Sequence, residues 1–217
     1  MRRAAALRLI APTLVLLAAG RGQRYRQASG QPQADKLLQP LADGTPVAAQ
    51  AARHLRLALP HAPAVAVVRP DASALAALLQ GQGWTVVSDA SVAAGMGRSL
   101  ALAVQASPGA AGWLVALGDM PFIAPASICA VAQAMGRRPD ALAAPLHAGR
   151  RGHPVGFGPA WGPQLAALDG DEGARGLLQR HAAALLAVPV DDPGVLADVD
   201  VPADLLPPAD EGAARKP

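Results

Sequence analysis

The chain has 217 residues, of which 52% are hydrophobic, 16% charged and only 3% aromatic. This length suits one large α/β domain, whose core must be built from Ala, Leu and Val. Because aromatic residues are so few, the composition argues against a base-stacking surface for single-stranded nucleic acid. The only cysteine, Cys129, allows neither an internal disulfide nor a cysteine-cluster metal site, and a reducing, cytoplasmic setting is expected.

The net charge of +3 is concentrated near the N-terminus. Six arginines precede the first acidic residue, Asp35, and the other 13 basic residues face all 16 acidic ones, so the rest of the chain carries −3. A local positive charge suits a small phosphorylated substrate better than a surface that follows a duplex. We therefore expect no nucleic-acid partner.

Residues 1–12 have some features of a secretory signal, with Met-Arg-Arg before an Ala/Leu-rich run. However, Arg8 and Pro12 interrupt the run, and cleavage near Ala19 would destroy the strand and loop that follow. The uncharged part of this N-terminal run covers only residues 9–20, whereas a membrane-spanning helix needs about 20 apolar residues. We expect an N-terminal extension at residues 1–12, and neither a signal peptide nor a membrane span.

The first apolar run, residues 14–17, ends in small residues and then in a turn rich in glycine and arginine. Such a run is typical of a buried parallel strand that delivers a loop. Glycines let the backbone approach a ligand, and consecutive backbone N–H groups can bind an anion, to which Arg21 and Arg24 add positive charge. The turn matches neither the Walker A pattern nor Gly-x-Gly-x-x-Gly, so a polyphosphate site and an ordinary turn both stay open.

Beyond this loop, residues 25–35 are polar and are predicted to be irregular. Strand-like and helical patterns then alternate to the end of the domain. The predicted strands are 14–17, 64–68, 84–87, 113–117, 141–145, 155–157, 185–190 and 195–199. The predicted helices are 47–59, 73–79, 99–106, 125–136, 159–168 and 173–181.

This alternation predicts a three-layer α/β/α sandwich with a mainly parallel sheet. The domain is expected to cover residues 13–206 and to be followed by a disordered tail, residues 207–217, rich in proline, alanine and charge. Ligands of such sheets bind beyond the carboxyl ends of the strands.

Four polar residues have two interpretations each. Asp119 and Asp200 are either turn or cap residues or ligands for Mg²⁺, which typically takes one or two carboxylates together with substrate phosphates. Lys36 is either an ordinary surface lysine or, with Arg24, a cation that offsets charge on a reacting phosphate. His153 lies between Gly and Pro and is either a structural turn residue or part of a site. A phosphate nucleophile is already ionised at pH 7 and needs no catalytic base.

Several short motifs occur in the order that is typical of one enzyme family. They are Leu17-Ala-Ala-Gly-x-Gly-x-Arg24 followed by Lys36, then Gly95 and Ser99, Leu117-Gly-Asp-Met-Pro121, Gly152-His-Pro154, and Asp198-Val-Asp-Val-Pro-Ala-Asp204. Together they resemble the molybdenum cofactor nucleotidyltransferases, most closely the cytidylyl-transferring members. The resemblance runs from about residue 13 to residue 206.

The resemblance implies a Rossmann-like nucleotidyltransferase fold and Mg²⁺-dependent transfer of CMP from CTP to the phosphate of the molybdopterin cofactor, with release of pyrophosphate. The residues that it places at the nucleotide base and triphosphate are Leu17, Ala18, Ala19, Gly20, Arg21, Gly22 and Arg24. It puts Lys36 on the phosphates, Asp119 and Asp200 on Mg²⁺, Gly95 and Ser99 on the nucleotide, and His153 on the pterin side. Transient contact with a recipient molybdoenzyme or its chaperone is also implied.

The sequence departs from the family pattern in ways that keep alternatives open. Arg26 stands where glycine is usual, and Lys36 lies twelve residues after Arg24, so the connection is either a lid or a sign that another group binds the phosphates. Val201 replaces the usual threonine. Leu-Ala-Ala-Gly favours CTP, whereas guanylyl-transferring relatives more often have Leu-Ala-Gly-Gly. The alternatives are transfer from GTP, transfer to a sugar phosphate, or a non-catalytic cofactor-binding chaperone.

Overall fold

The predicted alternation of strands and helices forms one central sheet in the computed structural model, which describes residues 11–136 and 138–208. Within these residues the strand order is β3-β2-β1-β4-β7-β5-β6, and β8 pairs with β5. The strands are β1 Thr13–Ala18, β2 Ala64–Val68, β3 Thr85–Ser88, β4 Trp113–Leu117, β5 Leu142–His147, β6 Arg150–Arg151, β7 Val155–Phe157 and β8 Leu186–Pro189.

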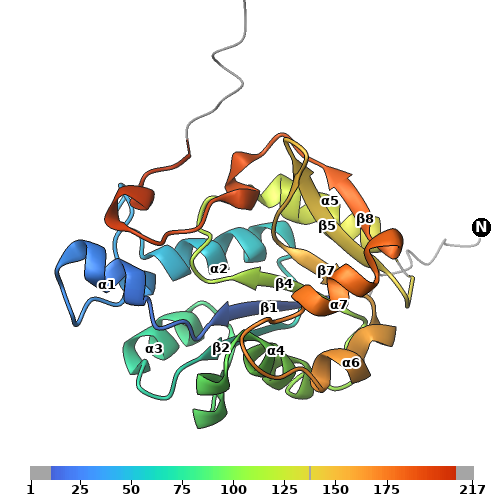
Figure 1. The fold of residues 1–217 in the computed structure, drawn as a ribbon, viewed down its shortest axis with the longest axis horizontal. Helices are drawn as coiled ribbons and strands as arrows, with labels where there is room; N and C mark the ends of the chain where they lie inside the picture. Colours follow the sequence, from blue (N-terminus) through green and yellow to red (C-terminus); the bar gives the residue numbers. More distant parts are fainter. Residues whose placement is uncertain (1–10, 137, 209–217) are drawn as a thin grey trace, which may run out of the picture.

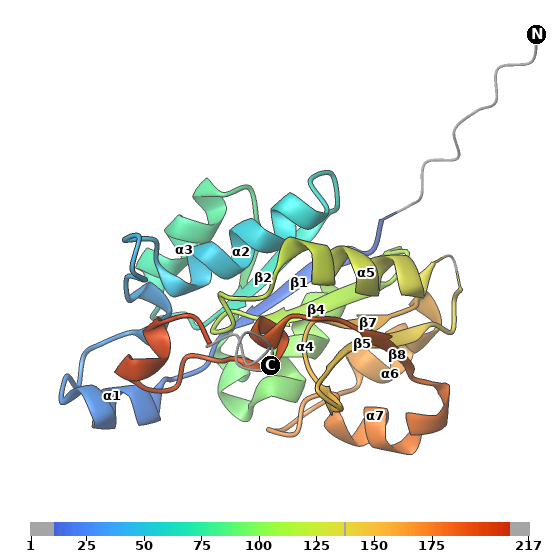
Figure 2. The ribbon, with the colours of Figure 1, turned by 90° about the horizontal axis from the view of Figure 1, so that it is seen from above.

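Helices cover both faces of this sheet, which confirms the predicted three-layer sandwich (Figures 1 and 2). On one face lie α2 (Val47–Ala58), α3 (Ser73–Gly81) and α5 (Pro125–Met135). On the other lie α4 (Met96–Gln105), α6 (Gly162–Ala166) and α7 (Arg175–Arg180).

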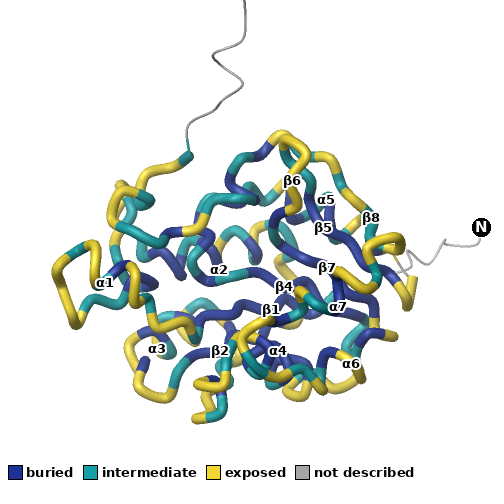
Figure 3. The backbone as a smooth tube through the Cα atoms, viewed as in Figure 1, coloured by how far each residue is buried: buried dark blue, intermediate teal, exposed yellow. Residues whose placement is uncertain are grey.

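Strand β1 contributes to the core on both sides of the sheet. Leu14 and Leu16 belong to the apolar cluster under α2, α3 and α5, whereas Val15 and Leu17 belong to the cluster under α4, α6 and α7. Alternate residues of a strand face opposite sides, so a central strand that is covered on both faces is apolar throughout. Figure 3 shows this burial as a dark stripe through the middle of the molecule.

The parallel strands bring their carboxyl ends to one edge of the sheet. β1 pairs in parallel with β2 and β4, and β2 pairs in parallel with β3. At this edge the Gly118 N–H donates to the Leu17 carbonyl at 2.8 Å, which fixes the turn after β4 against the end of β1. The Val199 N–H donates to the Asp119 carbonyl at 2.8 Å, which places the segment around Val199 across the same edge.

Two local predictions were wrong. Residues 25–35 are not wholly irregular, because α1 (Gln23–Ser29) forms after Gly22, whose φ of 61° is a left-handed conformation that favours glycine. This helix buries Tyr25. The predicted strand at residues 195–199 does not form. Its first residues belong instead to a 3₁₀ helix, η5 (Pro193–Leu196), whose start is capped by the side chain of Asp192. In both places, the secondary structure depends on tertiary contacts or on a cap and not on local composition.

The predicted N-terminal extension, residues 1–12, and the predicted tail, residues 207–217, lie almost entirely outside the described residues. Within the described part of the chain, no helix has the length and apolar character that crossing a membrane requires.

Candidate functional site

One cleft of about 960 Å³ at the carboxyl edge of the sheet gathers most of the residues that the sequence singles out. It lies between the loop after β1, the end of β4 and the start of α4. The predicted site residues that line it are Leu17, Ala19, Gly20, Arg21, Gly22, Arg24, Lys36, Gly95, Ser99, Asp119 and Asp200.

Two of the predicted residues do not line this cleft. Ala18 is buried in the core beneath α2, since it faces the opposite side of β1 from Leu17. The His153 N–H donates to the Val195 carbonyl at 2.9 Å, which ties the Gly-His-Pro turn to η5. Burial lowers the pKa of the His153 imidazole below its usual value, so this histidine is kept neutral.

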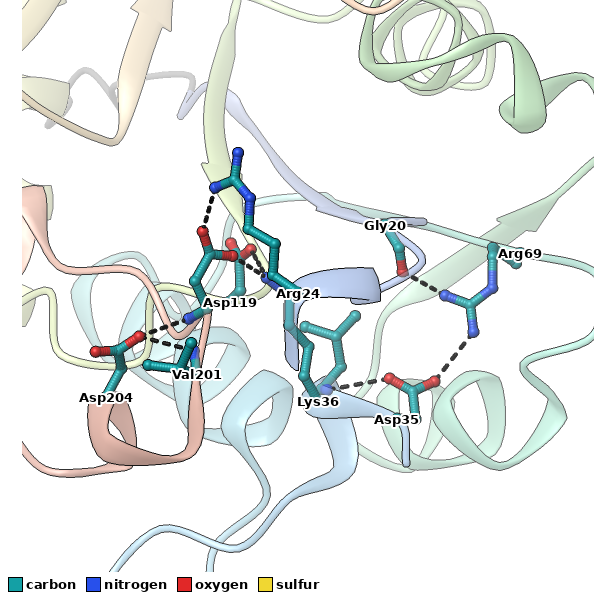
Figure 4. A network of polar contacts seen from close by, with 10 residues as sticks. Gly20, Arg24, Asp35, Lys36, Arg69, Asp119, Val201 and Asp204 are labelled. Carbon is teal, nitrogen blue, oxygen red and sulfur yellow. Dashed lines mark hydrogen bonds and ion pairs between the residues drawn. The ribbon is translucent and has the colours of Figure 1, made fainter. Parts of the chain in front are cut away.

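Lys36 reaches the cleft despite the long connection that precedes it. Its Nζ lies 2.7 Å from Asp119 Oδ2 and 3.1 Å from Asp200 Oδ1, and its side chain is only 8% exposed (Figure 4). Burial alone would lower the pKa of Lys36, but the Asp119 and Asp200 carboxylates outweigh burial and raise it. Lys36 is therefore a fixed positive charge between two carboxylates.

Arg24 supplies a second cation at the rim. Its Nη1 lies 2.7 Å from Asp200 Oδ2, and its side chain is 81% exposed. Desolvation would raise the pKa of Asp200, but hydrogen bonds from Lys36 and Arg24 hold it below its usual value. An ion pair this exposed contributes little to folding stability, so Arg24 is free to turn toward an anionic ligand.

Three carboxylates converge beside Lys36. Asp119, Asp198 and Asp200 each offer an oxygen, and these three oxygens lie within 4.8 Å of one another. The pKa of Asp198 is raised by desolvation and by repulsion from the neighbouring Asp200 and Asp119 carboxylates. Asp204 Oδ2 accepts from the Asp200 N–H at 2.9 Å and from the Val201 N–H at 2.8 Å, which fixes this segment (Figure 4). A set of carboxylate oxygens fits a hard divalent cation such as Mg²⁺ or Mn²⁺.

Gly95 and Ser99 line the cleft and also support its wall. A Cβ on Gly95 would lie 2.5 Å from the Gly170 carbonyl oxygen, so only glycine allows the loop at residue 170 to approach. The Ser99 hydroxyl donates to the Gly95 carbonyl at 3.1 Å, one turn earlier in the chain. The structure gives both residues a packing role at the start of α4.

Sequence reasoning missed five charged residues of this cleft and of the carboxylate cluster beside it, which are Arg26, Arg69, Asp71, Asp171 and Asp198. Asp198 lies two residues before Asp200, a spacing that places extended residues on the same side and that could have indicated it. Arg69 and Asp71 follow β2 and line the cleft. The rule that ligands bind beyond the carboxyl ends of parallel strands could have found both.

A second cleft, of about 1100 Å³, lies at the opposite edge of the sheet. It is lined by the starts of the parallel strands, among them Thr13, Ala64 and Thr85, and by Arg56 and His61. No acidic residue occurs among its described lining residues. The carboxyl-edge cleft is therefore the candidate for chemistry that needs cations and carboxylates together.

Comparisons with known proteins show the family of this chain. The family model for the MobA-like NTP transferase domain matches residues 14–194. No match was found among curated proteins.

Solved structures share the fold over most of the chain. Rv0371c from Mycobacterium tuberculosis H37Rv is 29% identical, with 89% of this chain and 94% of that chain covered and a TM-score of 0.73. A complex of the same protein with manganese is 27% identical, with 89% and 95% covered and a TM-score of 0.69. Mth528, a nucleotidyl transferase from Methanothermobacter thermautotroptrophicus, is 23% identical, with 89% and 94% covered and a TM-score of 0.75.

Proposed function

Because this chain belongs to the MobA-like NTP transferase family and is thus a nucleotidyltransferase, we propose that it transfers CMP from CTP to the phosphate of the molybdopterin cofactor. One observation carries the proposal: Lys36 and the carboxylate cluster meet in one cleft beside the loop after β1. A protein that only binds and delivers a cofactor has no need of this arrangement.

The proposed reaction forms one P–O bond and breaks another. An oxygen of the acceptor phosphate attacks the α-phosphorus of CTP, and the bond from the α-phosphorus to the bridging oxygen breaks. Pyrophosphate leaves with the electron pair of that bond. Since the attacking phosphate is already ionised, the protein has to position the reactants and offset negative charge.

The residues of the cleft can fill these roles. Backbone N–H groups of the loop at Gly20 and Gly22, with Arg21, would receive the triphosphate. Lys36 and Arg24 would offset charge on the reacting and leaving phosphates. Asp119 and Asp200, with Asp198, would hold Mg²⁺, which when bound supplies Lewis-acid stabilisation of phosphate oxygens.

The choice of base is proposed to depend on Ala19. Its side chain borders the cleft, whereas that of Ala18 is buried in the core. A methyl group at this position limits how closely a base can approach the backbone. This supports the smaller base of CTP over that of GTP.

A nucleotide panel tests the proposed function. Pyrophosphate release is measured with CTP, GTP, ATP or UTP, each with Mg²⁺ and molybdopterin, and CTP is expected to support the fastest release. The Ala19→Gly variant should increase the rate with GTP relative to CTP. Release with GTP but not CTP would overturn the base assignment. Tight binding of molybdopterin without pyrophosphate release from any nucleotide would favour a chaperone. Pyrophosphate release with a sugar phosphate but not with molybdopterin would show that the acceptor is a sugar phosphate.

Replacing Gly20 with alanine should weaken nucleotide binding without unfolding the protein. A Cβ on Gly20 meets no atom within 4 Å, so the methyl group fits the free protein but occupies space in the cleft. We expect the KM for the nucleotide to rise about tenfold, since close backbone approach is lost.

The matched control for this variant is Gly81→Ala. Gly81 also has no atom within 4 Å of a Cβ, but it lies in the last turn of α3, away from the cleft. The control should keep the wild-type KM. Equal KM values for Gly20→Ala and the wild type would show that the nucleotide does not contact this part of the loop.

A further inference from the structure

Arg69, directly after β2, joins three separate segments around the cleft. Its Nη1 donates to the Gly20 carbonyl, and its Nη2 donates to Asp35 Oδ2 at 3.1 Å (Figure 4). Its Nε donates to Asp71 Oδ1 at 3.1 Å. The side chain is only 14% exposed. The planar guanidinium can bind three acceptors in fixed directions, which a lysine ammonium cannot reproduce.

Asp35 divides its two carboxylate oxygens between Arg69 and the segment that carries Lys36. Oδ2 accepts from Arg69, whereas Oδ1 accepts from the Leu37 N–H at 3.0 Å and so caps the 3₁₀ helix η1 (Lys36–Leu38). A capping carboxylate fixes the first turn of such a helix. Asp35 thus links Arg69 to the segment that carries Lys36.

The sequence between Arg24 and Lys36 makes this support necessary. Helix α1 projects from the body of the protein (Figure 1), so the chain returns to the cleft only at η1. There the stem of Lys36 passes close to Gly22, where an added Cβ would lie 3.2 Å from Lys36 Cγ. Arg69 holds both sides of this contact, the loop through Gly20 and η1 through Asp35.

We propose that Arg69 is a positioning residue that holds Lys36 in the cleft through Asp35. Its role is to keep the lysine and the loop after β1 at a fixed separation, ready for the triphosphate. This inference rests on the proposed function for its importance in catalysis. The placement of Lys36 itself can be tested without any reaction.

Amine acetylation measures that placement directly, because Lys36 and Lys216 are the only lysines of the chain. The intact protein is treated briefly with acetic anhydride, and the labelling of Lys36 relative to Lys216 is read by mass spectrometry. In the wild type Lys36 is buried and paired with two carboxylates, so it should react slowly. In Arg69→Met we expect its relative labelling to rise at least about fivefold, because the support of Asp35 is lost.

Two further variants separate positioning from a general effect on folding. Asp35→Asn keeps an oxygen for the Leu37 N–H but loses the charge that pairs with Arg69, and it should also expose Lys36. Asp71→Asn is the matched control: Asp71 is 78% exposed and, among the described residues, pairs with Arg69 and not with η1, so labelling of Lys36 should stay at the wild-type level. The double variant Arg69→Met, Asp35→Asn should label no faster than the more reactive single variant, since both remove one interaction.

The result that overturns the proposal is unchanged labelling of Lys36 in an Arg69→Met protein whose circular dichroism is that of the wild type. If Arg69→Met does not fold, the labelling of Lys36 in Asp35→Asn tests the proposal by itself, and unchanged labelling overturns it. For pyrophosphate release, a positioning role predicts a lower kcat with a smaller change in KM. If Lys36 labelling rises in Arg69→Met but the wild type releases no pyrophosphate, the positioning role is supported and the proposed function is rejected.

Discussion

Replacing Asp119 with alanine should lower the rate of pyrophosphate release at least about 100-fold. Asp119 has two roles in the cleft: it is the nearer carboxylate to Lys36 Nζ, at 2.7 Å, and it belongs to the carboxylate cluster with Asp198 and Asp200. The variant would remove an oxygen proposed to bind Mg²⁺ and would loosen the lysine proposed to contact the phosphates. Both losses act on charge that develops during the reaction.

The fold should survive this change. Asp119 is partly exposed, and its backbone carbonyl would still accept from the Val199 N–H. Asp140→Ala is the control, since Asp140 lies before β5, at the opposite edge of the sheet, with a side chain that is 72% exposed. Chelation of divalent metal with EDTA should abolish release by the wild type, and added Mg²⁺ should restore it. Retention of activity within about tenfold of the wild type in Asp119→Ala would contradict the assigned role.

The sequence predicted the sheet well because its central strands are buried on both faces. In β1 and β4 nearly every residue is apolar, so the strand and its end can be recognised without knowledge of the partner strands. The carboxyl-end rule then placed Asp119 near the loop after β1. These predictions depend only on local pattern and on the shared direction of parallel strands.

The parts that escaped prediction depend on contacts between distant segments. Helix α1 is polar, and its position depends on the left-handed backbone of Gly22 and on the burial of Tyr25 in the core. The pairing of Arg69 with Asp35 joins residues 34 positions apart. No periodicity in either segment indicates that pairing, which is proposed to position Lys36.

A Lys36→Gln variant should lose activity and gain affinity for a divalent metal. The Nζ of Lys36 lies between Asp119 and Asp200, so its charge competes with a metal ion for the same oxygens. Glutamine removes that charge and leaves three carboxylates whose mutual repulsion a metal relieves. In the absence of nucleotide, we expect Mn²⁺ to bind at least about fivefold more tightly than to the wild type, and pyrophosphate release to fall about 100-fold or more.

Metal affinity is measured by electron paramagnetic resonance of free Mn²⁺ and by the rise in Tm on adding Mn²⁺. Arg24→Gln is the matched control, because Arg24 is exposed and contacts only one oxygen of Asp200, so its loss should change Mn²⁺ affinity much less. If Lys36 had a purely structural role, Lys36→Gln would bind Mn²⁺ more weakly than the wild type or equally well. That result would contradict the competition of Lys36 and the metal for the same carboxylates. Opposite changes in metal affinity and turnover are expected only if Lys36 pairs with the carboxylates in the free protein and turns to the phosphates when the metal and the nucleotide bind together.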